Sequence, residues 1–520
     1  MKSNFFKYTF FIIVFILIIL AIYILYKDGN SKTLAKEENK MRINMITDLN
    51  IGVTGFDTLN PILSNNIDTQ YISKLIFDPL LDITKDFRIE NCLTKEVSKL
   101  NSKTYLIKLK DDIYFHDGSK FTAQDVIFTI ESLKNNNINS IYKENVKDIE
   151  SMQKIDDYTL KISLNKEIEF FEYRLCIPIL CKNSYDENTL ESKTNLPNGT
   201  GKYKVESVDD KVIKLAISER NTSSNIKEIN VYIASSIKDL YDDFIKEKTD
   251  YIITSNIEYE KYLGVFGYNV IQVTGRKFDY LVLNNNNRFL SDKDVRKAIN
   301  YAIDRNSINY NIYNNKYYIS NFPLEYGSYL YDSNQTDSFN TNKAKAILID
   351  SGWRSYNNSW IKNGKVLRLN LITNRENDDR SRISKMIKEQ SEEIGIKIDI
   401  MEVDKYSYDR YLKNKSYDML LTGNIVPSYP SLNTYFGDDN LSNYNNEYIG
   451  EILTDIENID SKEVLKEKYL NIIDIYNEEI PFISLYFDNM FIISNKNLKG
   501  DLSCNWYNLF YNIDNWYKVK

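Results

Sequence analysis

Histidine is nearly absent from this chain: among 520 residues, His116 is the only one. Most catalytic triads need a histidine, and a metal site needs several converging ligands, to which no second histidine can contribute. The chain also lacks the Gly-x-Ser-x-Gly and His-Glu-x-x-His motifs of common hydrolases. We therefore expect a protein that is not an enzyme, with no catalytic residues, no metal site and no cofactor.

Cysteine is scarce as well, and the net charge is modest. Four cysteines are too few for a disulfide scaffold. Cys176 and Cys181 either form a disulfide or remain two buried thiols, and the sequence leaves both alternatives open. The 66 basic and 73 acidic side chains give a formal net charge of −7, which does not support nucleic-acid binding.

One long hydrophobic run occurs near the start of the chain. From Tyr8 to Tyr26 there is no charged side chain, and a transmembrane helix needs roughly 20 such residues. The run is longer than the apolar part of a cleavable signal peptide, and the first cysteine, Cys92, lies too far on for a lipoprotein. The sequence predicts an uncleaved membrane anchor, a polar stalk at 27–41 and a folded domain outside the cell, but leaves cleavage itself open.

The rest of the chain is too long for a single hydrophobic core and indicates roughly three domains. Segments with alternating apolar residues, such as TYLIKL at 104–109, predict strands that are interspersed with helices up to about residue 273. Beyond 274, helices with one apolar face follow, as in VRKAINYAI at 295–303. This mixture predicts layered α/β structure.

His116 itself lies in FHDGSKFTAQDVIFTIESL, residues 115–133, a pattern that predicts a strand end, a turn and a helix. Thr122 and Asp125 have the spacing of a capping pair at a helix N-terminus. Asn340 likewise precedes a predicted helix, and Gly352 follows its end. Because no partner for acid–base or metal chemistry accompanies it, we interpret His116 as a structural turn residue.

Six segments follow one another in a characteristic order: FDTLNPILSNNIDTQYISKLIFDPLL, FHDGSKFTAQDVIFTIESL, NGTGKYKVES, FLSDKDVRKAINYAIDRNSI, FNTNKAKAILIDSGW and NEEIPFISLYF. Together they resemble the extracellular solute-binding proteins of family 5, the oligopeptide, dipeptide and nickel class. The resemblance covers nearly everything from about residue 43 to 520. It implies a bilobal α/β fold of the periplasmic-binding-protein type with an extra inserted subdomain.

The resemblance also implies domain limits. The first lobe comprises residues 42–273 and contains the inserted subdomain at about 83–197. The second lobe comprises residues 274–486, and residues 487–520 return to the first lobe as C-terminal strands. Proteins of this kind need no catalytic group, because they act by closing two lobes over a solute.

The resemblance further implies ligand-facing positions in this chain. The acid that usually pairs with a peptide amino terminus is missing from TGNIVPSYPSLNTYF, where Gly423 is kept and Asn424 stands in place of a tryptophan. Asp68 or Asp404 could replace that acid. With 41 tyrosines in the chain, each single tyrosine also fits ordinary packing. The seven predicted ligand-binding positions are Asn65, Ile67, Tyr280, Tyr406, Asn424, Tyr429 and Tyr486.

The implied function is that of a membrane-anchored extracellular protein that delivers a peptide or similar small solute to the permease subunits of an ABC importer in the cell membrane. A tethered receptor that senses a peptide without transport is the alternative. A metal chelate or haem, held by aromatic and arginine side chains, stays open as the solute. The expected partners are the solute and the permease, with a monomeric protein and no nucleic acid.

Overall fold

The computed structural model describes residues 45–185, 196–220, 223–331, 339–456, 459 and 461–520. The predicted membrane anchor at 8–26 and the stalk at 27–41 lie outside the described residues. Within the described ranges, none of the helices combines the length and the apolar character needed to cross a membrane.

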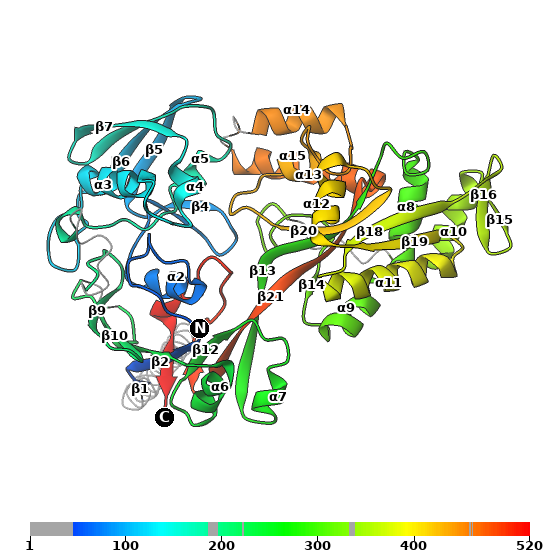
Figure 1. Cartoon of the computed structure of the whole chain (residues 1–520). Coiled ribbons are helices and arrows are strands. Elements are labelled where there is room, and N and C mark those ends of the chain that lie inside the picture. Colours follow the sequence, from blue (N-terminus) through cyan, green and yellow to red (C-terminus); the bar gives the residue numbers. More distant parts are fainter. Residues whose placement is uncertain (1–44, 186–195, 221–222, 332–338, 457–458, 460) are drawn as a thin grey trace, which may run out of the picture.

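Two lobes lie side by side and share one large mixed sheet (Figure 1). Two long antiparallel strands, β13 (Tyr268–Leu283) and β21 (Phe482–Asn495), run from one lobe into the other. We call them the crossover strands. From lobe 2 to lobe 1, the other strands in the order of this sheet are β19 (Lys397–Val403), β18 (Arg368–Asn374) and β20 (Met419–Ile425) before the crossover strands, and β12 (Tyr251–Thr254), β2 (Asp48–Val53), β11 (Glu228–Ile233), β10 (Val212–Ile217) and β9 (Tyr203–Val208) after them. The short strand β14 (Tyr318–Ile319) lies outside this order and pairs with β21.

The crossover strands form because their sequences are rich in aromatic and β-branched residues, which suit a buried, pleated surface. Their pairing is regular except in the middle, where the register shifts between Thr274 and Phe278 and again between Asp279 and Tyr280. The predicted lobe limits at 274 and 487 fall inside these two strands, and Phe278 pairs with Phe487. The change of register therefore lies at the passage from one lobe to the other.

Lobe 1 contains an inserted subdomain with a four-stranded antiparallel sheet. The elements of lobe 1 outside the shared sheet are β1 (Met45–Ile46), α2 (Ile67–Ser73), β3 (Leu81–Ile83), β4 (Ile89–Asn91), β5 (Thr94–Asn101), β6 (Thr104–Leu109), α3 (Ala123–Lys134), α4 (Lys143–Val146), β7 (Ile149–Asp156), β8 (Thr159–Leu164), α5 (Phe171–Arg174), α6 (Ile237–Ile245), α7 (Glu260–Leu263), β22 (Leu498–Lys499) and β23 (Tyr517–Val519). Strand β1 pairs with β23, so the C-terminal strand closes against the beginning of the described chain.

The subdomain confirms two local predictions. In β6, Tyr105, Ile107 and Leu109 are all but completely buried while Lys108 is exposed, because successive side chains of a strand point to opposite faces. At the start of α3, the Thr122 hydroxyl accepts a hydrogen bond from the Gln124 N–H, and the Asp125 carboxylate accepts one from the Thr122 N–H. The capping box that the sequence predicts is therefore present.

Lobe 2 packs helices on both faces of its part of the sheet (Figure 1). Leu281 of β13 joins the core on one face, and its neighbour Tyr280 joins the core on the other. Asn340 caps α10 as predicted, and Gly352 follows the helix end with a φ of 89°. The further elements of lobe 2 are α8 (Lys293–Ala302), α9 (Arg305–Tyr313), α10 (Thr341–Asp350), β15 (Arg354–Tyr356), β16 (Ser359–Lys362), β17 (Lys365–Val366), α11 (Asp378–Glu393), α12 (Lys405–Asn414), α13 (Asn433–Phe436), α14 (Glu447–Asp455) and α15 (Lys462–Glu479).

The motif at 289–308 has a structural role in lobe 2. Arg296 is buried, and its Nε donates to the carbonyl oxygens of Glu479 and Ile480 at 2.9 and 3.1 Å. Arg305 is also buried, and its Nε donates to the Ser484 carbonyl oxygen at 2.8 Å. Both arginines thus attach this helical segment to the start of β21, which supports the mixed α/β, bilobal architecture.

Candidate functional site

A cavity of about 530 Å³ lies between the lobes, beside the crossover strands. Lobe 1 contributes Ile67, Tyr71 and other residues of α2, together with side chains of the inserted subdomain. Lobe 2 contributes the loop that follows β20, including Ser428. Because both lobes and the crossover strands line it, this first cavity has the position of an interlobe ligand site.

The crossover strands line the first cavity at the place where their register shifts. Gly275 is required there, since a Cβ atom at this position would lie only 2.2 Å from Asp488 Oδ1. The same Oδ1 accepts a hydrogen bond from the Lys277 N–H at 2.9 Å. Residues 275–277 consequently form a bulge, and a bulge of this kind re-aims the side chains that it carries.

Arg276, at the centre of the bulge, connects three parts of the protein. Its Nε donates to the Val426 carbonyl oxygen at 2.8 Å, and the Val426 N–H donates back to the Arg276 carbonyl oxygen at 2.9 Å. Its guanidinium carbon lies 4.5 Å from the ring centroid of Trp506, a cation–π distance. Burial lowers the pKa of Arg276, and the Glu325 carboxylate opposes this. The arginine therefore links lobe 2 to the C-terminal segment of lobe 1.

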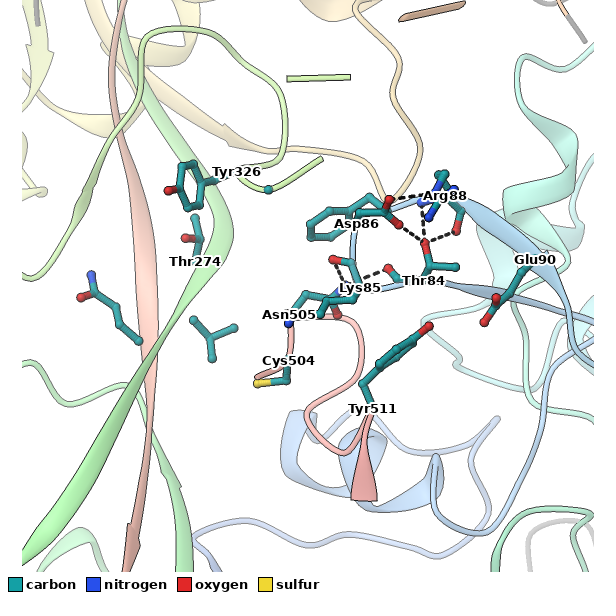
Figure 2. Close-up of a pocket in the computed structure, with 14 residues that line it drawn as sticks. Thr84, Lys85, Asp86, Arg88, Glu90, Thr274, Tyr326, Cys504, Asn505 and Tyr511 are labelled. Atoms are coloured by element: carbon teal, nitrogen blue, oxygen red, sulfur yellow. Dashed lines mark hydrogen bonds and ion pairs between the residues drawn. The ribbon is translucent and has the colours of Figure 1, made fainter. Parts of the chain in front are cut away.

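A second hollow, of about 580 Å³, lies next to the first cavity, where Trp506 is stacked on Phe87 at 5.9 Å between ring centroids. Figure 2 shows Thr274 and Tyr326 on one side of this hollow, and Asn505 and Tyr511 on the other. The hollow also includes the turn between β3 and β4. In that turn Phe87 has a φ of 65°, a strained value for a bulky residue.

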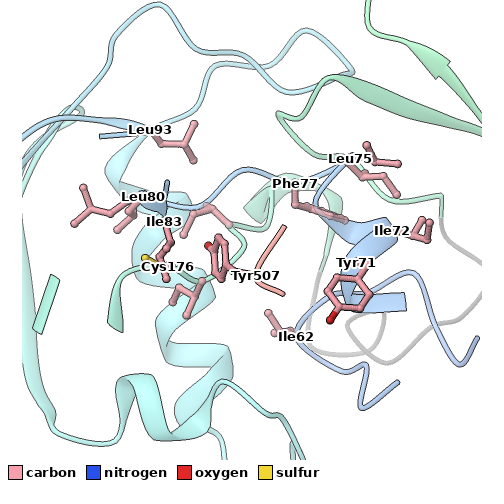
Figure 3. Packing of buried hydrophobic residues seen from close by; sticks show 14 of the residues in the cluster. Ile62, Tyr71, Ile72, Leu75, Phe77, Leu80, Ile83, Leu93, Cys176 and Tyr507 are labelled. Carbon is pink, nitrogen blue, oxygen red and sulfur yellow. The ribbon is translucent and has the colours of Figure 1, made fainter. Parts of the chain in front are cut away.

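The wall of the first cavity continues into the core of lobe 1. Figure 3 shows Tyr71, Cys176 and Tyr507 packed within one buried cluster, and the same three residues line the cavity. The Lys74 ammonium, also lining the cavity, lies 3.4 Å from the ring centroid of Tyr507. Burial lowers the pKa of Lys74. The cavity thus offers aromatic faces together with cations.

Two carboxyl groups that the sequence analysis missed lie at this cleft. Asp488 lines the first cavity, and burial raises its pKa although the Lys277 N–H donates to it. Glu325 lines a narrow passage beside the cavity, and burial raises its pKa to about 8, with Arg276 opposing. Sequence patterns could not identify either residue, because Asp488 lies within a mostly apolar strand and Glu325 lies in a segment without periodicity.

The lobes also contact each other away from the crossover strands. The Glu169 carboxylate of the subdomain accepts hydrogen bonds from Ser431 Oγ at 2.7 Å and Asn433 Nδ2 at 2.9 Å in lobe 2. The ring of the neighbouring Phe170 lies 6.3 Å from that of Tyr429. We call these five residues the interlobe contact. Burial raises the pKa of Glu169.

Of the seven predicted positions, Ile67 and Tyr429 line the spaces described above, whereas Asn65 and Asn424 do not. Ile67 is 58% exposed and lines the first cavity, and Asn65 is exposed in the loop two residues before it. Tyr429 lines the narrow passage and takes part in the interlobe contact. Asn424 exchanges hydrogen bonds with the Tyr435 hydroxyl at 3.0 and 3.1 Å, so its amide is engaged within lobe 2.

The other three predicted positions do not line the first cavity, the second hollow or the narrow passage. Tyr280 is 3% exposed and stacks on Phe278 at 5.3 Å, and Tyr486 is 1% exposed and donates its hydroxyl hydrogen to the Arg305 carbonyl oxygen. Both face cores because the strand alternation turns them away from the cleft. Tyr406 is 80% exposed on the outer helix α12.

The two proposed replacement acids have structural roles. The Asp68 carboxylate is buried and accepts hydrogen bonds from the N–H groups of Thr54 and Gly55 at 3.1 and 3.0 Å. Asp404 caps α12 by accepting a hydrogen bond from the Ser407 N–H at 2.8 Å. The carboxyl groups that line the cleft, Asp488 and Glu325, are therefore others than those the sequence suggested.

His116 and the cysteines also have structural positions. The imidazole Nδ1 accepts from the Gly199 N–H at 3.3 Å, and Nε2 lies 2.9 Å from the Gly201 carbonyl oxygen, which fits a neutral ring protonated on Nε2. Burial lowers the His116 pKa, consistent with that state. Cys176 and Cys181 are both buried and unpaired. Within the ranges described above, no group of three or more His, Cys, Asp or Glu side chains is placed to hold a metal ion.

Comparisons with known proteins agree with this geometry. Residues 89–446 match the family described as "Bacterial extracellular solute-binding proteins, family 5 Middle". The oligopeptide-binding protein AppA of Bacillus subtilis is 24% identical over 97% of this chain and 98% of its own length. The nickel-binding protein NikA of Staphylococcus aureus is 22% identical over 79% and 83%. The open, unliganded structure of the periplasmic murein tripeptide-binding protein MppA aligns with 92% of this chain and 98% of its own, at 16% identity and a TM-score of 0.78.

Proposed function

Because the chain belongs to the bacterial extracellular solute-binding proteins of family 5, we propose that it captures a peptide or a similar small solute between its lobes and delivers it to an ABC importer. The observation that carries this proposal is the cavity of about 530 Å³, which both lobes and the crossover strands line. A volume in the range of roughly 300–1,000 Å³ suits a small ligand. The solute binds there without any covalent step.

The lining suits a solute with both apolar and polar groups. Tyr71 and Trp506 provide flat apolar surfaces, whereas Asn145 and Ser428 provide polar side chains that can hydrogen-bond to a peptide backbone. The bulge at 275–277 is the place where a small change of backbone angles re-orients one lobe relative to the other. The solute stabilises the closed arrangement because it contacts both lobes only in that arrangement.

Membrane anchoring is a second part of the proposal, and it rests on the uncharged run from Tyr8 to Tyr26. We expect the full-length protein to stay in the membrane fraction after washing with carbonate or high salt, since a helix of that length is held by the hydrocarbon core. Cell fractionation followed by immunoblotting measures this. A soluble mature protein whose first residue lies near 36 would show instead that a signal peptidase removes the segment.

The experiment that tests solute capture uses the folded part of the full chain as cells produce it. Native mass spectrometry of protein purified from its own culture identifies the bound solute by mass, and calorimetry with that solute measures its affinity. Small-angle scattering should then show a decrease in the radius of gyration when the solute is added. A protein that carries no solute and does not compact with any peptide offered would refute the proposal.

A tethered receptor that senses the same solute without transport makes the same binding predictions. Uptake of radiolabelled solute by cells separates the two functions. Transport requires that deletion of the protein abolishes uptake, whereas a receptor would leave uptake unchanged. Permease and ATPase genes next to its own gene would favour transport.

A further inference from the structure

Glu325 is an acidic side chain that is buried at the cleft. It lies in lobe 2, in the segment that follows β14, and is only 8% exposed. In the described chain, neither of its two carboxyl oxygens has a partner with normal hydrogen-bond geometry, although the nearby indole N–H of Trp506 opposes the rise in the Glu325 pKa. A buried carboxylate without partners is costly, because it loses its hydration and gains nothing in return.

Glu325 lines the narrow passage, which shares a lining residue with each of the two larger spaces. The passage has a volume of about 10 Å³. Ser428 lines both the passage and the first cavity, and Phe87 lines both the passage and the second hollow. A space of this size holds about one water molecule, or a group of similar size at the tip of a solute that lies in the first cavity.

The charges around Glu325 are unbalanced when it is ionised. Arg276 of β13 is the cation that faces it, but Arg276 donates to Val426, stacks on Trp506 and forms no ion pair with Glu325 in the part of the chain described. Asp488 of β21 adds a second negative charge nearby. The uncharged Trp506 and the hydroxyl of Tyr435 on α13 complete the surroundings. Two carboxylates therefore face one guanidinium, and Lys277 offsets part of the charge of Asp488.

We propose that Glu325 receives an ammonium group of the bound solute, which enters the passage from the first cavity. This inference rests on the proposed function, since it assigns the chemistry of the solute at that same site. An ammonium has three N–H donors and one positive charge, so it can satisfy both oxygens of Glu325 and restore the charge balance. The ammonium is supplied by a basic side chain or by the amino terminus of a peptide.

Binding of an ammonium also requires that Glu325 be ionised. Burial raises the pKa of Glu325 to about 8 in the free protein, so most molecules carry the proton at pH 7. The carboxyl then releases this proton to solvent as the ammonium binds. Between pH 6 and 8, the affinity for an ammonium-bearing solute should accordingly rise with pH.

Four peptides distinguish the two sources of ammonium. The first pair tests a side-chain ammonium: N-acetylated, C-amidated Ala-Lys-Ala is compared with the same peptide in which norleucine replaces lysine. The second pair tests an amino-terminal ammonium: free trialanine is compared with N-acetyl-trialanine. Calorimetry of the full chain should show that one ammonium-bearing peptide binds about tenfold to a hundredfold more tightly than its neutral match. In two buffers of different ionisation enthalpy at pH 7, that peptide should release close to one proton.

Glu325→Gln is the test variant, and Glu131→Gln is its matched control. Glu131 carries the same side chain on an exposed face of α3, outside the cleft. Glu325→Gln should remove both the preference for the ammonium and the proton release, while Glu131→Gln should keep both. Glutamine imitates the protonated carboxyl, and thermal unfolding verifies that the variant is folded.

The outcomes separate the inference from the proposed function. Equal affinities within both peptide pairs, with compaction still visible by scattering, would overturn the inference and leave peptide capture intact. An ammonium preference that Glu325→Gln retains would overturn it as well, because another group would then hold the cation. If none of the four peptides bound the folded protein, the inference would fail together with the peptide part of the proposed function.

Discussion

At the scale of single residues, His116 shows how one side chain joins two distant segments. Its ring accepts a hydrogen bond from the Gly199 N–H and lies within hydrogen-bond distance of the Gly201 carbonyl oxygen. The histidine therefore holds the Gly-Thr-Gly corner at 199–201 against the turn at 115–118. A Cβ atom on Gly199 would lie 1.9 Å from the Ile76 carbonyl oxygen, which explains the glycine there. The histidine is thus part of the framework of lobe 1.

The variant His116→Gln tests this structural role. The affinity for the solute should stay within a few-fold, and the free energy of unfolding should fall by at most ~1 kcal/mol, the usual contribution of a hydrogen bond. The pH dependence of stability should change too. Burial lowers the His116 pKa in the folded protein, so below about pH 6.5 the unfolded chain binds more protons and stability falls as the pH falls.

Chemical denaturation between pH 5 and 8 measures both effects. The wild-type protein should lose stability on the acid side of this window, and the variant should lose less. A hundredfold loss of solute affinity in a normally folded variant would contradict the structural role of His116.

At the scale of elements, the crossover strands determine how the lobes are joined. The bulge at 275–277 interrupts their pairing, and the Asp488 carboxylate occupies the space that a side chain at Gly275 would need. The bulge therefore depends on one glycine and one carboxylate, which lie on opposite strands.

Gly275→Ala tests this dependence. The new methyl group must displace Asp488 and break its hydrogen bond with the Lys277 N–H, so we expect a loss of roughly 1–3 kcal/mol in the free energy of unfolding, as for other overpacked sites. Gly267→Ala is the matched control, because its Cβ would meet its nearest atoms at an ordinary 3.8 Å. Denaturation midpoints that coincide for the two variants would show that the bulge tolerates a side chain.

At the scale of the whole molecule, the crossover strands join the lobes on one side, and contacts outside these strands join them elsewhere. Among these contacts are the interlobe contact of Glu169, Phe170, Tyr429, Ser431 and Asn433 and the hydrogen bond from the Tyr329 N–H to the Asp86 carbonyl oxygen. The crossover strands are continuous backbone, whereas the interlobe contact consists of side chains that can separate. The equilibrium between lobe arrangements should therefore respond to changes in the interlobe contact.

Glu169→Ala should shift that equilibrium toward separated lobes. The variant loses two hydrogen bonds to a charged acceptor, each contributing about 1.5–3 kcal/mol at most. We expect a larger radius of gyration by small-angle scattering and a several-fold weaker affinity for the solute, because the binding-competent arrangement is less populated.

Glu167→Ala is the control for this variant. Glu167 is exposed and only approaches Lys99 at 3.9 Å, and exposed ion pairs of this kind contribute little. Scattering curves and affinities of Glu169→Ala that match those of the control would mean that the interlobe contact does not influence the arrangement of the lobes.

The sequence by itself determined the class of fold and the local signals. The order of six segments indicated the family, and Thr122, Asp125, Asn340 and Gly352 marked helix ends where the structure has them. Such signals are readable because capping and strand alternation depend on residues only a few positions apart.

Only the tertiary structure decided which side chains reach the cleft. Arg276, Glu325 and Trp506 come from three separate segments and meet there, whereas Tyr280 and Tyr486 turn into cores although their positions resembled ligand-facing ones. A shift of register in the crossover strands changes which face a residue points to, and that shift arises from contacts between residues more than 200 positions apart. Periodicity within one segment carries no information about such contacts.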